Sequence, residues 1–316
     1  MADARHTGSA GTPPRHPKHW PVWFGVGVLV LLTRLPYSWQ LGLGKGIGLI
    51  LHKVARSRRH IAEVNIGLCF PEKTPKEQAA LVRQIFIDNG IGLMETFMGW
   101  FRDPNWLRPK TEFVGFDKVR EAQASGQGVM LLGAHYSMLD LAGSLLSTEL
   151  HISVSYRPQD NPVMNYIMER NRARFYDECL TRKDIRAFIR TLRQGKVLWY
   201  AQDQDFGRKN SVFVNFFGHP AATITATSRI AKAGKAKVMP LTYFRKPDHS
   251  GYVITVHDPI DIPSGNDEAD AQLANDFIEQ QLRANPSQYL WLHKRFKTPV
   301  DPATKKGSLY KKNNKA

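Results

Sequence analysis

The sequence predicts an α/β fold with a mainly parallel sheet. Short apolar segments alternate with amphipathic helical segments after Pro104, and no internal repeat is visible. This alternation is typical of strands and helices that pack in layers as a sandwich. The chain has 316 residues, of which 42% are hydrophobic, so it is long enough and apolar enough for one large α/β domain or two small ones.

Each predicted element has its own signal. A helical pattern runs from Pro75 to about Phe101, with apolar residues at spacings of three and four that fit either a core-facing or a lipid-facing stripe. A second helix is predicted over residues 185–194, because its apolar face ends at Gly195, a typical C-terminal stop. Strands are predicted where apolar runs are bounded by Gly and polar turns, at 129–134, 197–201, 238–244 and 252–257.

Residues 20–51 are predicted to anchor the chain to a membrane. The apolar stretch 21–32 is shorter than the roughly 20 residues that cross a bilayer. Tryptophan and tyrosine residues flank it at both ends, and a second Gly-rich apolar segment follows at 41–51, a pattern typical of interfacial anchors. One tilted span and a hairpin in one leaflet both fit this pattern, and we favour the span. No clear cleavage site follows, which disfavours a signal peptide.

The charge of the chain predicts an anionic partner. The chain has 44 Lys and Arg against 28 Asp and Glu, a formal net charge of +16. Such basicity suits nucleic acid, an anionic membrane or a phosphorylated substrate. No nucleic-acid recognition motif is present, so nucleic acid is not expected. A basic cluster at 52–60 directly follows the apolar segments and favours a main domain on the cytoplasmic side.

The chain is predicted to divide into four parts. These are a flexible N-terminus at 1–19, the membrane anchor at 20–51, the main domain at 52–298 and a disordered basic tail at 299–316. Two cysteines, Cys69 and Cys179, form neither a C-x-x-C pair nor a zinc-ligand pattern. They are expected to be small buried side chains in a reducing compartment.

Residues 126–146, GQGVMLLGAHYSMLDLAGSLL, carry the strongest chemical signal. An apolar strand ends at Ala134, and a helix is expected near Ser137, so that His135 lies in the turn at the carboxyl end of a strand, where ligands bind. Asp140 falls in the first helical turn and could hold the imidazole as a general base. Ser137 and Asp140 could equally form a capping box, and spacing alone leaves both interpretations open. No G-x-S-x-G elbow is present, which favours direct transfer without a covalent enzyme intermediate.

A second acidic motif, Asp203-Gln204-Asp205, could be a D-x-D metal site of the kind that glycosyltransferases use with nucleotide sugars. Arg157 lies beside a turn at Pro158. A solvated surface arginine is one interpretation of Arg157.

The H-x-x-x-x-D form of HYSMLD resembles the glycerolipid acyltransferase superfamily. Within it, nearly the whole chain resembles the late acyltransferases of lipid A biosynthesis, of the lauroyl and palmitoleoyl type. The matching blocks, in order, are HPKHWPVWFGVGVLVLLTRLP, NIGLCFPE, GLMETFMGWF, SVSYRPQDNP, RKDIRAFIRTLRQGKVLWYAQDQDFG, VFVNFFGHPAATIT and PSQYLWLHKRFK.

The resemblance implies a glycerolipid-acyltransferase-like sandwich behind an N-terminal membrane-anchoring helix, with residues 52–298 as the acyltransferase domain. It implies transfer of a fatty acyl chain from acyl carrier protein to a hydroxyl of the Kdo-bearing lipid A precursor, at the cytoplasmic face of the bacterial inner membrane. The partners implied are acyl-acyl carrier protein, a phosphorylated glycolipid acceptor and inner-membrane lipids. No cofactor is implied beyond the thioester of the donor.

By this resemblance His135 is the general base and Asp140 its partner. Several members of this branch carry Glu where Asp140 stands, and this departure bears on the preferred acceptor. Arg157 matches the second motif of the family, and Arg182 and Lys183 become candidates for the lipid phosphates.

The remaining site residues also follow from the resemblance. Asp203 and Asp205 match a D-x-D-x-G block of the family, which implies a role in shaping the substrate pocket, with no metal expected. Phe216, Phe217 and Thr223 are expected to line the acyl or acceptor groove, with core packing as the alternative for the two phenylalanines.

Three other functions compete with acylation of a lipid A precursor. The first is acylation of glycerol phosphate or lysophosphatidate by the same chemistry. The second is a metal-dependent D-x-D glycosyltransferase. The third is a basic membrane-binding protein without catalysis, which leaves the matching blocks unexplained.

Overall fold

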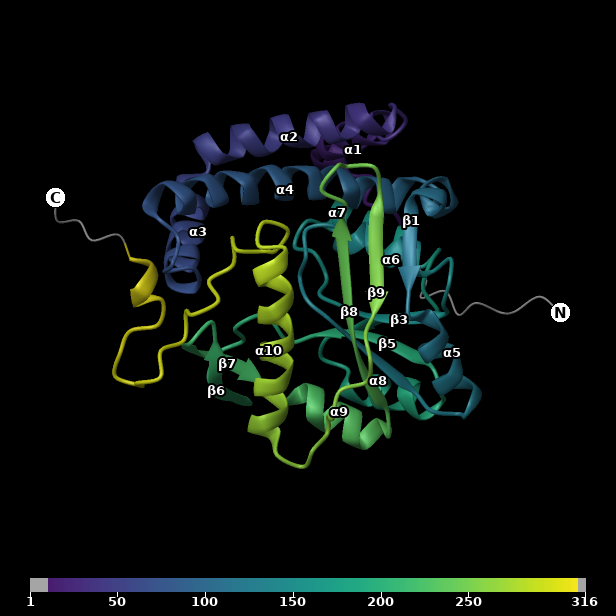
Figure 1. Ribbon diagram of the computed structural model, residues 1–316. Helices are drawn as coiled ribbons and strands as arrows, with labels where there is room; N and C mark the ends of the chain where they lie inside the picture. The colour runs from purple at the N-terminus through teal and green to yellow at the C-terminus, as the bar shows by residue number, and fades with distance from the viewer. Residues whose placement is uncertain (1–10, 312–316) are drawn as a thin grey trace.

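A seven-stranded, mostly parallel sheet lies at the centre of residues 11–311, the part of the chain that this computed structural model describes (Figure 1). Its strand order is β1-β9-β8-β2-β5-β3-β4, and each neighbouring pair is parallel except β8 with β9. The strands are β1 (Thr111–Val114), β2 (Val129–Gly133), β3 (Ile152–Tyr156), β4 (Glu178–Thr181), β5 (Val197–Ala201), β8 (Lys237–Arg245) and β9 (Tyr252–Val256). The α/β fold with a mainly parallel sheet is therefore confirmed, and the four predicted strands are β2, β5, β8 and β9.

Helices cover both faces of the sheet. They are α5 (Phe116–Ala124), α6 (Leu139–Leu146), α7 (Pro162–Arg172), α8 (Ile185–Arg193), α9 (Ala226–Gly234) and α10 (Asp267–Ala284). Successive residues of β2 point to opposite faces, as a strand requires. Val129 and Leu131 therefore join the core beneath α4 and α6, whereas Met130 and Leu132 join a second core beneath α8 and α9. A separate antiparallel hairpin of β6 (Ser211–Phe216) and β7 (His219–Ile224) packs against α10.

Four N-terminal helices precede the sheet; three of them form a layer at the top of Figure 1, and the third in sequence runs down from that layer. They are α1 (Trp20–Leu32), α2 (Tyr37–Val54), α3 (Arg56–Cys69) and α4 (Pro75–Phe101). The predicted bounds of α4 are confirmed, and its start is fixed by a capping box in which Thr74 and Glu77 satisfy each other's backbone donors. Helix α2 lies along α4 so closely that a side chain on Gly48 or Gly90 would overlap the other helix's backbone. This contact explains two of the glycines of α2, Gly44 and Gly48.

The predicted anchor consists of two helices joined at residues 33–36. No helix within residues 11–311 combines the length and the apolar character that crossing a bilayer requires. Both helices nevertheless present large apolar side chains to the outside. Phe24 is 77% exposed and Leu31 70% exposed on α1, and Trp39 and Ile50 are similarly exposed on α2.

The two ends of the described chain are more ordered than the sequence predicts. Pro17–His19 form a 3₁₀ helix, and the indole of Trp23 donates to the carbonyl of Pro14, so the predicted flexible N-terminus is wrong for this part. At the other end Tyr310 is buried and its hydroxyl donates to Asn65 at 2.6 Å. The prediction of a disordered tail is therefore wrong around Tyr310. Residues 1–10 and 312–316, which both predictions also cover, lie outside the described residues.

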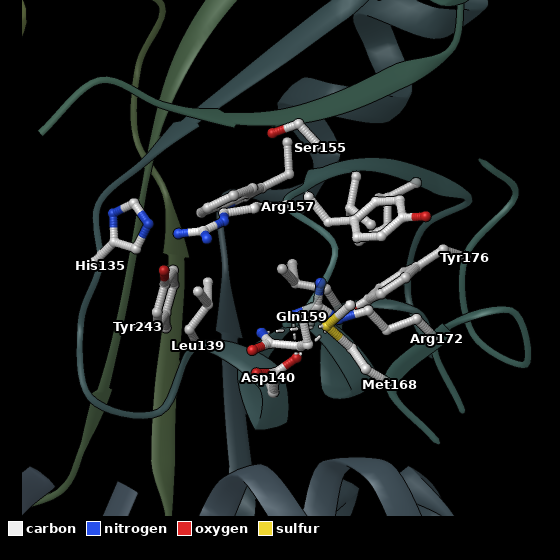
Figure 2. A pocket seen from close by; sticks show the side chains of 16 residues that line it. His135, Leu139, Asp140, Ser155, Arg157, Gln159, Met168, Arg172, Tyr176 and Tyr243 are labelled. Atoms are coloured by element: carbon white, nitrogen blue, oxygen red, sulfur yellow. Dashed lines mark hydrogen bonds and ion pairs between the residues drawn. The ribbon is translucent and has the colours of Figure 1, made fainter. Parts of the chain in front are cut away.

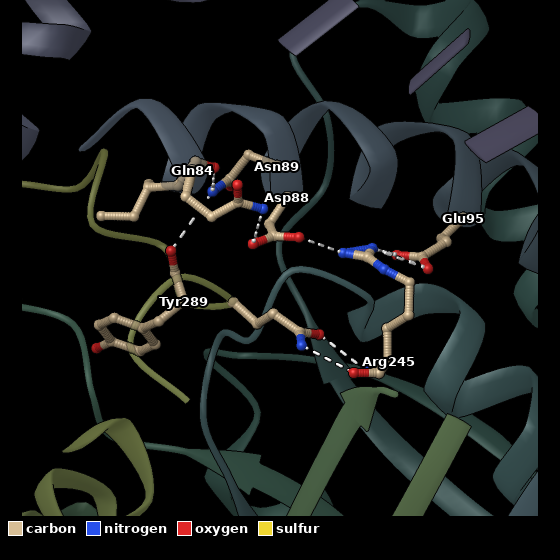
Figure 3. A network of polar contacts seen from close by, with 8 residues as sticks. Gln84, Asp88, Asn89, Glu95, Arg245 and Tyr289 are labelled. Atoms are coloured by element: carbon tan, nitrogen blue, oxygen red, sulfur yellow. Dashed lines mark hydrogen bonds and ion pairs between the residues drawn. The ribbon is translucent and has the colours of Figure 1, made fainter. Parts of the chain in front are cut away.

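A buried charge network joins α4 to the end of β8 (Figure 3). The guanidinium of Arg245 donates to Asp88 at 2.7 Å and to Glu95 at 3.2 Å, and Glu95 is 0% exposed. Because hydrogen bonds and opposite charges compensate the buried groups, this Arg245 network fixes α4 over the carboxyl edge of the parallel strands.

Candidate active site

His135 and Asp203 meet at the carboxyl edge of the sheet. His135 lies in the turn after β2, Asp203 follows β5, and these two strands are parallel neighbours. Their ends therefore reach the same edge. Nδ1 of His135 lies 2.7 Å from Oδ1 of Asp203, and the backbone N–H of His135 donates to Oδ2 at 2.9 Å. These two contacts fix both the position and the orientation of the imidazole.

The electrostatics of this pair favour a charged histidine beside a charged aspartate. Burial lowers the pKa of His135, but the carboxylate of Asp203 outweighs burial, so the pKa lies above the ordinary histidine value. Burial raises the pKa of Asp203, but the charge and hydrogen bonds of His135 outweigh it, so this pKa lies below its usual range. Asp203 is therefore ionised at neutral pH and stabilises the imidazolium.

Asp140 has a different partner from the one that the sequence predicts. It lies in the first turn of α6, as expected, but Oδ1 accepts from Arg172 Nη2 at 2.6 Å and from Nε at 3.0 Å. Within residues 11–311 no hydrogen bond joins Asp140 to His135, and no side chain caps α6. Both the expected pairing with His135 and the capping box are therefore wrong. The reason is that α6 begins at Leu139, later than predicted, and α7 brings Arg172 against its first turn.

A pocket of about 190 Å³ runs from His135 toward α7 and the segment after it (Figure 2). Its wall combines polar with apolar and aromatic residues. The polar residues are His135, Asp140, Ser155, Arg157, Gln159 and Arg172. The apolar and aromatic ones include Leu139, Leu146, Ile152, Val154, Met168, Tyr176, Trp199 and Tyr243. We call this cavity the His135 pocket. It offers a base at one end and a hydrocarbon-like interior behind it.

The three predicted basic residues lie at or near this edge. Arg157 follows β3, lines the His135 pocket and is exposed, with an ion pair to Asp160 at 3.1 Å. Arg182 and Lys183 follow β4, the next strand, and are exposed outside the pocket. The guanidinium of Arg182 lies over the ring of Phe206. Of these three basic residues, Arg157 lines the pocket and Arg182 and Lys183 lie outside it.

Asp205 and Thr223 do not line the His135 pocket. Asp205 is buried and accepts from the backbone N–H and the hydroxyl of Thr298, both at 2.8 Å, so it fastens the chain that leads toward the C-terminus. Thr223 is buried and accepts from Arg295 at 2.8 Å. The prediction that Thr223 lines the groove is therefore wrong for this pocket, and Asp205 lies outside the pocket lining. In the D-x-D motif, Asp203 and Asp205 hold different partners.

Phe216 and Phe217 also lie away from the His135 pocket. Both are buried at the end of the β6–β7 hairpin, where they pack against each other and against Trp291. The prediction that they line the groove is therefore wrong for this pocket, and core packing, the alternative interpretation, describes them.

Two residues of the pocket wall, Arg172 and Tyr176, have no local sequence signal. Arg172 pairs with Asp140 across 32 positions, and Tyr176 lies four residues after it at the far end of the pocket. The pairing of His135 with Asp203 spans 68 positions. The pairing of His135 with Asp203 could have been predicted only from the expectation that the carboxyl ends of neighbouring parallel strands meet at one edge.

Sequence comparison identifies the family. The profile described as "Bacterial lipid A biosynthesis acyltransferase" matches residues 11–298. The lipid A biosynthesis lauroyltransferase of Escherichia coli (strain K12) is 37% identical over 90% of this chain and 93% of its own length. The palmitoleoyltransferase of the same strain is 34% identical over the same shares. An acyltransferase of Haemophilus influenzae is 35% identical over 93% of this chain and 95% of its own length.

A comparison with solved structures finds similarity at a low level. One such structure is the 1-acyl-sn-glycerophosphate acyltransferase of Thermotoga maritima, with 12% identity and a TM-score of 0.35 over 74% of this chain and 97% of that one. This similarity is too low to inform on function. The profile match and the identities over most of the chain show that this protein is an acyltransferase and belongs to the bacterial lipid A biosynthesis acyltransferase family.

Proposed function

We propose that this acyltransferase moves a fatty acyl chain from the thioester of acyl carrier protein to a hydroxyl of a phosphorylated, Kdo-bearing lipid A precursor, at the cytoplasmic face of the bacterial inner membrane. The observation that carries the proposal is the contact between His135 and Asp203, with His135 lining a partly apolar pocket. A base beside an apolar cavity suits transfer of a hydrocarbon chain to an alcohol. The names of the relatives support the substrate class.

His135 is the general base of this mechanism. Asp203 holds Nδ1, so Nε2 is the nitrogen left to accept a proton from the acceptor hydroxyl. The hydroxyl oxygen attacks the thioester carbonyl as its proton passes to Nε2. The tetrahedral intermediate then collapses, the carbon–sulfur bond breaks, and the imidazolium returns the proton to the leaving thiolate. The products are the new ester and the free thiol of the carrier, and no acyl-enzyme forms.

A transfer assay with purified protein tests this proposal against its rivals. Acyl-acyl carrier protein and the lipid A precursor should give the acylated precursor with wild-type protein, and His135→Ala should give none above background. Glycerol phosphate should not compete, and a chelator should not slow the reaction. Competition by glycerol phosphate would favour the glycerolipid alternative, and loss of activity with chelator would favour the D-x-D alternative. Equal product yields from wild type and His135→Ala would remove the proposed reaction.

Arg157 is proposed to bind an anionic group of the acceptor. Its guanidinium belongs to the pocket lining but is exposed, so an incoming phosphate can displace Asp160 from it. Arg157→Ala is expected to raise the KM for the acceptor about tenfold, with a smaller change in kcat. Steady-state kinetics with varied acceptor measures both constants. A loss confined to kcat would instead assign Arg157 to the oxyanion, and unchanged kinetics would exclude both roles.

The apolar surface of α1 and α2 is proposed to bind the membrane within one leaflet. This surface consists of exposed side chains such as Phe24, Leu31, Trp39 and Ile50. The exposed cations Lys53, Arg56 and Arg58 follow it in sequence, and such cations attract anionic headgroups. Helix α4 packs against both α2 and α6, so the proposed membrane-binding layer adjoins the helix that borders the pocket. A lipid acceptor could thus reach His135 from the bilayer.

Phe24→Ser/Leu31→Ser should weaken binding to anionic vesicles at least tenfold, since each side chain contributes apolar area that leaves water. Flotation with vesicles of phosphatidylglycerol and phosphatidylcholine measures the partition. Val300→Ser/Leu273→Ser is the matched control, because these side chains are exposed elsewhere. Equal partition of the α1 variant, the control and the wild type would contradict this membrane-binding surface.

A further inference from the structure

Tyr176 separates two cavities. Of the described residues, it alone lines both the His135 pocket and a second cavity of about 410 Å³. It follows α7 and precedes β4, and its side chain is almost fully buried. Figure 2 shows Tyr176 on the side of the pocket opposite to His135. The phenol ring therefore forms the partition at the far end of the pocket.

A glycine leaves the space that the side chain of Tyr176 occupies. Gly143 of α6 lines the same pocket, and a Cβ at this position would overlap the hydroxyl of Tyr176. The phenol thus packs directly against the helix backbone, where only glycine leaves room for it. Because α6 also supplies Asp140 to the pocket wall, the position of the ring depends on the same helix that borders the base.

The two cavities differ in chemistry on the two sides of the ring. Between His135 and Tyr176 the pocket offers Leu139, Val154 and Met168, with the charges of Asp140 and Arg172 neutralising each other. Beyond the ring, the second cavity is lined mainly by polar residues, with Pro104, Leu150 and Phe175 as its apolar part. The polar residues include Asp103, Asn105, His151, Arg174 and Asp177. Burial of a hydrocarbon chain is therefore more favourable on the His135 side of Tyr176 than beyond it.

On the basis of the proposed function, we propose that Tyr176 is the floor of the acyl-chain pocket and sets the longest acyl chain that the protein transfers. With its thioester carbon at His135, the chain lies against the apolar wall and its terminal methyl group meets the phenol ring. Each methylene that fits adds about fourfold to binding. A donor two carbons too long must displace the ring or leave its carbonyl out of reach of the base, which should reduce kcat/KM at least tenfold.

Transfer rates with a series of acyl-acyl carrier protein donors that differ by two carbons test this assignment. In wild type, kcat/KM should fall at least about tenfold at the first donor beyond the optimum. In Tyr176→Ala, which joins the two cavities, this fall should shrink to within about threefold. Tyr176→Phe keeps the ring and should keep the wild-type limit. Tyr200→Ala, which removes a buried tyrosine outside the pocket, should also keep it.

A second pair of variants decides the matter if Tyr176→Ala does not fold. Gly143→Ala adds a methyl group in the pocket, so its optimum should move to shorter donors, and Gly143→Ala/Tyr176→Phe should move it back because the overlapping hydroxyl is gone. An unchanged chain-length limit in Tyr176→Ala, or in both Gly143 variants, overturns the assignment of Tyr176 while acyl transfer itself stands. A wild-type protein that transfers no acyl chain from any donor overturns the proposed function as well.

Discussion

Alanine in place of His135 is expected to lower kcat by about three orders of magnitude, with little change in the KM of either substrate. The imidazole is the group that takes the proton from the attacking hydroxyl, and no other described residue of the pocket combines a suitable pKa with this position. Rates under saturating donor and acceptor measure the effect. A variant that keeps a tenth or more of the wild-type kcat would show that His135 is not the base.

The pH dependence separates the two candidate partners of His135. Activity should rise with pH as the imidazole of His135 loses its proton. The midpoint of this rise, the acidic limb of the pH–rate profile, should lie above the ordinary histidine pKa, because Asp203 raises the pKa of His135. Asp203→Asn removes the anion, so the pKa of His135 falls and the acidic limb moves to lower pH, while kcat drops. Asp140→Asn is the control, because Asp140 pairs with Arg172, and it should leave the limb in place. The opposite result, a shift with Asp140→Asn and none with Asp203→Asn, would restore the pairing expected from the sequence.

Arg245→Met is expected to lower the free energy of unfolding by about 3–5 kcal/mol, because it leaves the buried carboxylates of Asp88 and Glu95 without their positively charged partner. Urea denaturation measures the loss. Arg229→Met, which breaks an ion pair that is more exposed, should change stability by less than about 1 kcal/mol. Adding Asp88→Asn and Glu95→Gln to Arg245→Met should recover part of the loss. A loss no greater than that of Arg229→Met would show that the Arg245 network does not stabilise the fold.

The same network predicts how this loss depends on pH. Burial raises the pKa of Glu95, and the charge of Arg245 opposes this rise. A folded pKa above the unfolded one means that the folded state binds more protons, so the contribution of Glu95 to stability falls as pH rises. Without Arg245 this pKa rises further. The deficit of Arg245→Met relative to wild type should therefore shrink from neutral to mildly acidic pH.

Local sequence signals were sufficient for some of the helices and strands and insufficient for the side-chain pairings. Helix α4 was predictable because Thr74, Pro75 and Glu77 specify its start and an apolar stripe follows. The strands β2 and β5 were predictable because each is a short, fully apolar run. Strands β1 and β4, by contrast, have four residues each and half-buried patterns, so their sequences resemble loops.

The candidate site was predicted in part. The sequence placed His135 correctly in the turn after a strand, but the H-x-x-x-x-D spacing suggested a local partner. The pairing of β2 with β5 brings Asp203 to the imidazole instead, and α7 brings Arg172 to Asp140 on α6. Phe217 resembled a pocket residue because aromatic side chains suit lipid grooves and cores equally well, and only the position of its hairpin decides between them.

Mass spectrometry of lipid A from cells that lack this protein tests the central claim most directly. The cells are complemented with wild type, His135→Ala or Asp203→Asn, each checked for equal abundance. The account predicts lipid A that lacks one acyl chain in the deletion strain, full restoration by wild type, and no restoration by His135→Ala. Lipid A that is unchanged by the deletion, or that is restored equally by His135→Ala, would contradict it.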